Sequence, residues 1–228
     1  MAQPPRHRAL VIVPAFNEAE SIAQVVRDLL EHAPGCDILV VDDGSTDDTA
    51  DRVPPEAMLL RLPFNLGIGG AMQAGYRFAH RYGYDIAVQV DGDGQHPADA
   101  VPKLIEQLEA TGDDLIVGSR FLEASGYAQS FSRMTGIRIL NLLIRLLTGS
   151  PISDCTSGFR AASRHAIAAF ARWYPDDYPE PEVVLLLRRA GYRVCEAPVQ
   201  MRQRQTGQTS IPLHRGLFYV TKVAFALI

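Results

Sequence analysis

Short runs of aliphatic, often β-branched residues alternate with amphipathic stretches through the first half of the chain, and this alternation restricts the fold more than any other feature. In the first amphipathic stretch, Ile22, Val26 and Leu29 fall on one helical face, and Gly35 suits a C-terminal cap. Repeats of strand, helix and strand are typical of an α/β fold with a doubly wound, mostly parallel sheet flanked by helices. The expected strands are residues 9–13, 37–41, 58–62, 85–90 and 114–118, and the expected helices are residues 17–35, 69–83 and 97–112.

The second half is less regular, and it contains no linker rich in Gly, Ser or Pro that would mark a domain boundary. Because 228 residues are ample for one buried core, we expect a single domain over residues 1–228 that ends in amphipathic segments. Residues 182–200 should form a helix and a closing strand, and the acidic segment 176–182 should be a surface loop.

Charge is divided unevenly along the chain. Residues 1–114 contain 8 Lys and Arg against 19 Asp and Glu, whereas residues 115–228 contain 14 against 7, which gives net charges of about −11 and +7. No apolar run approaches the ~20 residues of a spanning helix, and Pro14 interrupts the apolar stretch near the N-terminus. We therefore expect a cytoplasmic protein without a signal peptide, whose widely spaced cysteines (Cys36, Cys155 and Cys195) are mostly small buried side chains.

Small, acidic and glycine residues follow the expected strands, at the edge where ligands of such sheets bind. Asp91 and Asp93 flank Gly92 directly after one strand, so the two carboxylates are suited to a hard divalent cation that also binds a diphosphate, with Gln95 as a neutral third ligand. Each acidic motif, taken alone, is equally consistent with an ordinary turn, since Asp and Gly are turn formers. Their occurrence after neighbouring strands favours a ligand site.

Other phosphate-binding patterns fit less well. A dinucleotide fingerprint would need glycine where Met72 stands, and the phosphate-loop sequence ending in Gly-Lys-Ser/Thr does not occur. An aspartyl phosphatase would carry its paired aspartates near the first strand, and a receiver domain would be about half as long and would use Thr and Lys at later strand ends.

As a set, the motifs resemble those of glycosyltransferase family 2, which has the GT-A fold, and within it most closely the dolichyl- or polyprenyl-phosphate sugar synthases. The resemblance covers roughly residues 9–165 and is carried by VIVPAFNEAESI, VVDDGSTDDT, NLGIGGAMQAGY, VQVDGDGQHP, GSRF and DCTSGFR. It implies an inverting, metal-dependent enzyme that transfers a hexose from a UDP- or GDP-sugar to a polyprenyl-phosphate lipid, with Mg2+ or Mn2+ as cofactor. The acidic half, residues 1–114, would bind the donor, and residues 115–228 the acceptor.

The resemblance also implies roles for individual residues. Phe16 stands where many members have Tyr, so any contact through that hydroxyl is lost. Asp91, Asp93 and Gln95 would bind the metal ion, and Gly67 and Gly92 would lie against the donor. The base and ribose would be held by Pro14, Phe16, Glu18, Asp42 and Asp43, and a basic loop with Arg202 and Arg204 would close over the donor, although the lysine usual at its end is missing.

The resemblance implies that Arg120 and Arg133 face the phosphate of the acceptor lipid or of the donor, and that they bind the acceptor together with Ser157. It places Asp154 near the reacting centre. The expected catalytic residues are therefore Asp93, Arg120 and Asp154. A phosphate acceptor is already anionic near neutral pH, so positioning would dominate. With a sugar hydroxyl as acceptor, Asp154 would be the best general base, worth ~100- to 10,000-fold in rate.

Residues 132–149 place Ile137, Leu140, Ile144 and Leu147 on one stripe among arginines, and the tail 214–228 repeats this basic, apolar pattern. Such a helix can lie at a membrane surface, or it can be a core helix whose arginines reach solvent. Given the resemblance, we expect peripheral attachment at the inner face of the membrane and no nucleic-acid partner. Two alternatives stay open: transfer to a sugar hydroxyl of a growing glycan, and a non-catalytic nucleotide-sugar-binding protein.

Overall fold

The computed structural model describes residues 7–122, 131–149, 151–176 and 179–202. Its strands form one seven-stranded sheet in the order β3-β2-β1-β4-β6-β5-β7. Only β6 runs antiparallel to its neighbours, which confirms the mostly parallel sheet. The strands are β1 (Ala9–Ala15), β2 (Cys36–Asp42), β3 (Met58–Arg61), β4 (Ile86–Gln89), β5 (Leu115–Ser119), β6 (Arg160–Ser163) and β7 (Val194–Pro198).

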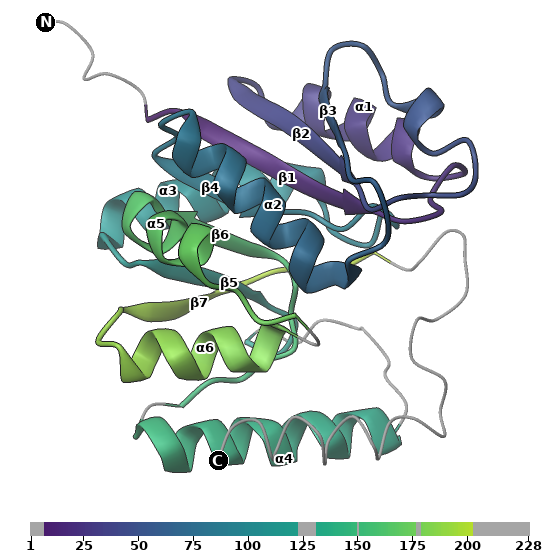
Figure 1. Cartoon of the computed structure of the whole chain (residues 1–228). Helices are drawn as coiled ribbons and strands as arrows, with labels where there is room; N and C mark the ends of the chain where they lie inside the picture. Colours follow the sequence, from purple (N-terminus) through teal and green to yellow (C-terminus); the bar gives the residue numbers. More distant parts are fainter. Residues whose placement is uncertain (1–6, 123–130, 150, 177–178, 203–228) are drawn as a thin grey trace, which may run out of the picture.

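Helices cover both faces of the sheet (Figure 1). One face carries α1 (Ile22–His32) and α3 (Val101–Thr111), together with the 3-10 turn η2 (Ala98–Ala100). A further 3-10 turn, η1 (Ala50–Arg52), follows β2. The other face carries α2 (Gly67–Arg81), α5 (Arg164–Arg172), α6 (Pro179–Arg189) and α4 (Phe131–Thr148).

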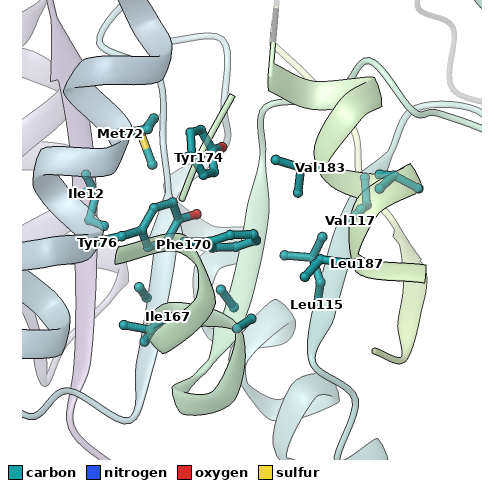
Figure 2. Packing of buried hydrophobic residues seen from close by; sticks show 14 of the residues in the cluster. Ile12, Met72, Tyr76, Leu115, Val117, Ile167, Phe170, Tyr174, Val183 and Leu187 are labelled. Atoms are coloured by element: carbon teal, nitrogen blue, oxygen red, sulfur yellow. The ribbon is translucent and has the colours of Figure 1, made fainter. Parts of the chain in front are cut away.

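The core has two layers because side chains of a strand alternate between the faces of the sheet. Leu10 and Ile12 of β1 pack toward α2, whereas Val11 and Val13 pack toward α1. On the α2 side, an aromatic group of Tyr76, Phe170 and Tyr174 joins α2 to α5 and the segment after it (Figure 2). Burial of each large apolar side chain contributes about 1.5–3 kcal/mol, so these contacts fix α2 and α5 against the sheet.

Strand β6 was not predicted, because its sequence Arg-Ala-Ala-Ser contains no β-branched or aromatic residue. Its antiparallel direction matters for function: Arg160, its first residue, pairs with Gln89 near the end of β4 and with Val117 of β5. The loop before β6 therefore lies at the same edge as the carboxyl ends of the parallel strands.

Residues 179–182 are not the expected surface loop, because α6 begins at Pro179 and buries both Pro179 and Pro181. The expectation for the cysteines is correct only in part. Cys155 is fully buried, and burial raises the pKa of its thiol to about 12, but Cys36 is half-buried and Cys195 is exposed.

The apolar stripe predicted for residues 132–149 is a core stripe. Ile137, Leu140 and Ile144 of α4 are buried, and Leu147 packs against the same cluster, where α4 meets α6. Among the described residues, no helix has the length and apolar character needed to cross a membrane.

The first turn of α2 approaches the chain at Pro175 and Asp176 so closely that only glycine fits at position 69. The Gly69 amide donates to the Asp176 carbonyl at 3.2 Å, and a Cβ atom would collide with both carbonyl oxygens. Alanine improves helix propensity by about 1 kcal/mol, but overpacking against backbone costs about 1–3 kcal/mol. We expect Gly69→Ala to lower the urea midpoint by more than Gly83→Ala, which meets no neighbouring atom and loses stability only because alanine is strained at a φ of +72°. An unchanged midpoint in Gly69→Ala would contradict this packing.

Candidate active site

The loops after β1 and β2 are tied together at the carboxyl edge of the sheet. Asn17 adopts a left-handed conformation with φ of 55°. Its amide donates to the Ser45 hydroxyl at 3.0 Å, and its side-chain oxygen accepts from the Thr46 amide at 2.9 Å. This link leaves Phe16 substantially exposed beside the loop after β2, while Pro14 is buried in β1.

Asp42 and Asp43 are buried, and their carboxylates organise the surrounding backbone. Asp43 accepts from the amides of Leu66 and Gly67 at 2.8 and 2.9 Å, so it caps the start of α2. Burial raises the pKa of Asp43, and the two amide hydrogen bonds oppose that rise. Asp42 accepts from the Ser45 amide at 3.0 Å and faces Arg61 at 3.4 Å. Both carboxylates thus hold the backbone of the loops that are expected to bind the base, and they do so from buried positions.

Glu18 lies close to the turn that carries the expected metal ligands. Its carboxylate accepts from the Ser21 hydroxyl at 2.9 Å, and its carbonyl accepts from the first amides of α1. A Cβ atom at Gly92 would lie 3.1 Å from the Pro14 carbonyl oxygen and 3.6 Å from Cγ of Glu18. The turn after β4 therefore packs directly against the end of β1.

The turn after β4 presents Asp91 and Asp93 at this edge. The Asp91 side chain is 37% exposed, and its amide donates to Nδ1 of His96 at 2.9 Å. Asp93 accepts from the Gln95 amide at 3.0 Å, which closes the turn. Across from it, a Cβ atom at Gly158 would lie 3.3 Å from both carboxylate oxygens of Asp91, so the missing side chain leaves room beside that carboxylate.

These donors suit a hard divalent cation. The described residues contain no group of three or more His, Cys, Asp or Glu side chains that could hold a metal by themselves. Two carboxylates and the Gln95 amide oxygen would therefore provide part of a coordination shell, as expected for an ion that also takes oxygens from a ligand. The space beside Gly158 fits that arrangement.

Gly158→Ala tests this space. The added methyl group would lie 3.1 Å from Nε2 of Gln89 and 3.3 Å from the Asp91 oxygens. Because Asp91 is partly exposed, its carboxylate can move aside, so we expect little change in the melting temperature but weaker Mn2+ binding, measured by calorimetry. A lower melting temperature with unchanged Mn2+ affinity would contradict this reading. Gly149→Ala, which meets no neighbouring atom but places alanine at a φ of +71°, is the control for Mn2+ affinity alone.

Arg120 and Asp154 form a buried ion pair. Nε and Nη2 of Arg120 donate to the two carboxylate oxygens at 2.6 and 2.7 Å, and the Arg120 amide adds a third hydrogen bond at 3.2 Å. Asp154 is fully buried, and the Thr156 hydroxyl also donates to it. The Asp154 amide in turn donates to the Glu196 carboxylate of β7 at 2.9 Å. Asp154 is therefore placed to orient Arg120, and this geometry does not suit a general base.

The remaining predicted residues are engaged in other contacts or lie outside the described side chains. Ser157 is buried, and its hydroxyl accepts from the Phe159 amide at 3.3 Å. The Arg202 amide donates to the Gln95 carbonyl, but its guanidinium pairs with Asp28 of α1 at 2.8 Å. Arg204 is outside the described residues, and Arg133 belongs to α4 but its side chain is not described.

Two charged residues near the site were missed by the sequence reasoning. Arg160 is buried at the start of β6, where it donates to the carbonyls of Ser157, Cys155 and Glu180 at 2.7–3.1 Å. Burial raises the pKa of Glu180, and the charges of Arg160, Asp91 and Arg120 act on it. Glu180 lies in the first turn of α6. Proline and glutamate before an apolar run are signals of a helix start, so the sequence from Pro179 to Glu182 could have identified this helix.

The sequence matches Glycosyl transferase family 2 over residues 10–170. The chain belongs to this family. It is therefore a glycosyltransferase, as the motifs predicted. In the solved structures, the chain is similar to glucosyl-3-phosphoglycerate synthase from Mycobacterium tuberculosis in complex with Mn2+, UDP and phosphoglyceric acid, with a TM-score of 0.73, 21% identity and coverage of 97% of this chain and 77% of that one. That likeness confirms the GT-A fold.

Curated relatives of this glycosyltransferase include two enzymes of lipid-linked sugar synthesis. Polyprenol monophosphomannose synthase of Mycolicibacterium smegmatis is 31% identical over 214 residues, which span 89% of this chain and 80% of the relative. Undecaprenyl-phosphate mannosyltransferase of Micrococcus luteus is 30% identical over 217 residues, which span 90% of this chain and 87% of the relative. The predicted similarity to the polyprenyl-phosphate sugar synthases is thus confirmed.

Proposed function

We propose that this protein is an inverting, metal-dependent glycosyltransferase that moves a hexose from a UDP- or GDP-sugar to a polyprenyl-phosphate lipid. One observation carries the proposal: two segments lie together at one edge of the sheet. They are the turn with Asp91 and Asp93 and the loop in which Asp154 holds Arg120. The turn with Asp91 and Asp93 suits a cation and the donor diphosphate, and Arg120 suits a second anion, the acceptor phosphate. The names of the relatives in M. smegmatis and M. luteus support a polyprenyl-phosphate acceptor.

On the donor side, the chain would hold the nucleotide in the loops after β1, β2 and β4. Phe16 offers an exposed ring to the base, while Asp42 and Asp43 keep those loops in shape. Asp91, Asp93 and Gln95 would hold Mg2+ or Mn2+, which when bound offsets negative charge on the leaving diphosphate. The solved relative bound to Mn2+ and UDP supports both ligands.

On the acceptor side, Arg120 would orient the phosphate whose oxygen attacks the anomeric carbon. That oxygen is anionic near neutral pH, so the reaction needs alignment more than proton removal. The bidentate contact with Asp154 fixes the guanidinium plane, and a fixed donor array is more effective than one that must reorganise. We propose that residues 1–228 form one domain, whose residues 1–114 bind the donor and 115–228 the acceptor.

The outer face of α4 supports attachment to the cytoplasmic face of a membrane. Ile139, Leu142 and Leu146 are 45%, 55% and 72% exposed, and Arg138 and Arg145 lie on the same exposed face. Aliphatic side chains can enter the headgroup region while arginines pair with anionic lipids, each contributing about 1 kcal/mol near the surface.

The double variant Leu142→Glu/Leu146→Glu tests this attachment. We expect the fraction that sediments with anionic phosphatidylglycerol liposomes to fall at least about tenfold, because two charges replace two apolar side chains. Leu30→Glu, at a half-exposed position of α1, is the control and should sediment like the parent protein. Equal sedimentation of the double variant and the parent would exclude α4 as the attachment surface.

A sugar hydroxyl acceptor is less well supported, because the best candidate base, Asp154, is buried in the pair with Arg120. A non-catalytic binding protein would retain the donor site without turnover.

A transfer assay separates these functions. Purified protein is mixed with radiolabelled UDP-glucose or GDP-mannose and Mn2+, with undecaprenyl phosphate and a soluble glycan as acceptors, and label is counted in the organic phase and on the glycan. We expect labelled lipid that disappears with EDTA and returns with added Mn2+. Label recovered only on soluble glycan acceptors would favour the hydroxyl reaction. Donor binding without any transfer would favour the binding protein.

A further inference from the structure

His96 is a buried side chain that makes both of its ring-nitrogen contacts with Asp91. Nδ1 accepts the Asp91 amide hydrogen at 2.9 Å, and Nε2 lies 3.5 Å from Oδ2 of the same residue. An N–H group can donate only to an unprotonated nitrogen, so the neutral ring must carry its proton on Nε2. The Asp91 carboxylate lies beside the ring at this 3.5 Å distance, and the directed contact is the hydrogen bond from the Asp91 amide to Nδ1.

The ring is held in place from two directions. His96 precedes Pro97, and a residue before proline is kept in the extended region. On the other side, the imidazole stacks on Phe159, with ring centroids 5.0 Å apart and an angle of 24° between the planes. Phe159 is fully buried, and its carbonyl accepts from the Gly118 amide at 2.8 Å, so the stacking partner is anchored in the sheet.

Phe159 and Gly158 are consecutive residues that serve the same carboxylate. Gly158 leaves space beside the Asp91 oxygens, and Phe159 supports the ring that contacts them. The antiparallel β6 brings both residues beside the end of β4, about seventy residues earlier in the chain.

We infer that His96, whose Nδ1 accepts the Asp91 amide hydrogen and whose ring is supported by Phe159, is a positioning residue that holds Asp91 in the place required for the cation. The inference rests on the proposed metal-dependent function, and it gives His96 no contact with the substrate. Partners that orient a ligating group typically change metal affinity 10- to 100-fold when they are removed.

Three substitutions separate the nitrogen contacts from the ring stack. His96→Phe keeps the stack and removes both nitrogens. His96→Asn keeps an acceptor near the position of Nδ1, whereas His96→Gln reaches toward Nε2 and loses that acceptor. The control is His165→Phe, because His165 also stacks on an aromatic ring, Tyr192, with centroids 4.4 Å apart, and also contacts an aspartate, Asp114, at 3.1 Å. It lies after β6, at the opposite edge of the sheet.

Mn2+ is titrated into each protein with saturating UDP or GDP, and free Mn2+ is followed by electron paramagnetic resonance. We expect the Kd for Mn2+ to rise about 10- to 100-fold in His96→Phe and His96→Gln, to recover mostly in His96→Asn, and to stay unchanged in His165→Phe. Long-range 15N–1H spectra of the metal-free protein should show the His96 proton on Nε2.

Unchanged Mn2+ affinity in His96→Phe and His96→Gln, or a proton on Nδ1, would overturn the inference while the proposed function stands. Absence of Mn2+ binding by the parent protein with either nucleotide would instead overturn the proposed function, and with it the role of His96.

Discussion

Asp91→Asn is expected to reduce sugar transfer by at least about 1,000-fold. The substitution preserves shape but replaces one anionic ligand by a neutral amide, and a metal ion contributes several kcal/mol to stabilising developing charge. About 4 kcal/mol corresponds to about three powers of ten in rate. The measurement is transfer to undecaprenyl phosphate at saturating donor, with the melting temperature recorded in parallel. The melting temperature should change little, because Asp91 is partly exposed.

Asp51→Asn is the matched control, since Asp51 is an exposed carboxylate of η1 outside the site. It should transfer sugar at the parent rate. Transfer by Asp91→Asn within tenfold of the parent protein, at the same Mn2+ concentration, would remove Asp91 from the metal site.

Breaking the Arg120–Asp154 pair is expected to have the largest effect on stability. Either single alanine substitution leaves the other charge buried without its partner, which typically costs about 3–5 kcal/mol. Arg120 and Asp154 are both almost fully buried, so water cannot easily replace the lost contact. Urea unfolding should show this loss in both Arg120→Ala and Asp154→Ala.

The double variant Arg120→Met/Asp154→Leu separates stability from chemistry. Replacing a buried pair by apolar residues of similar size is often neutral in stability, so we expect the urea midpoint to recover while transfer remains absent. Transfer that returns together with stability would show that Arg120 has no role beyond the fold.

The regular elements of the first half could be predicted because their apolar positions repeat with a clear period. All five expected strands, from β1 to β5, are present, and α1, α2 and α3 lie between them. Strand β6 could not be predicted in this way, because its two alanines give no β-branched signal and its burial depends on β4 and β5 on either side.

The motifs identified the edge of the sheet where the site lies, but not the contacts within it. Sequence spacing placed Asp91 and Asp93 after a strand, and the structure adds Gly158 and Phe159 from the loop before β6, the strand that runs the other way. Similarly, the apolar stripe of α4 was identified correctly, but periodicity alone cannot tell which partner covers it. Ile137 and Ile144 face the core, and the exposed apolar side chains lie on the opposite side of the helix.

The central claim is that the turn after β4 holds a divalent cation against a nucleotide diphosphate. The most direct measurement is anomalous X-ray scattering from crystals soaked with Mn2+ and UDP or GDP. We predict a manganese peak within coordination distance of carboxylate oxygens of Asp91 and Asp93, in contact with the diphosphate. A bound nucleotide whose phosphates lie away from these two residues, with no manganese peak between them, would contradict the account.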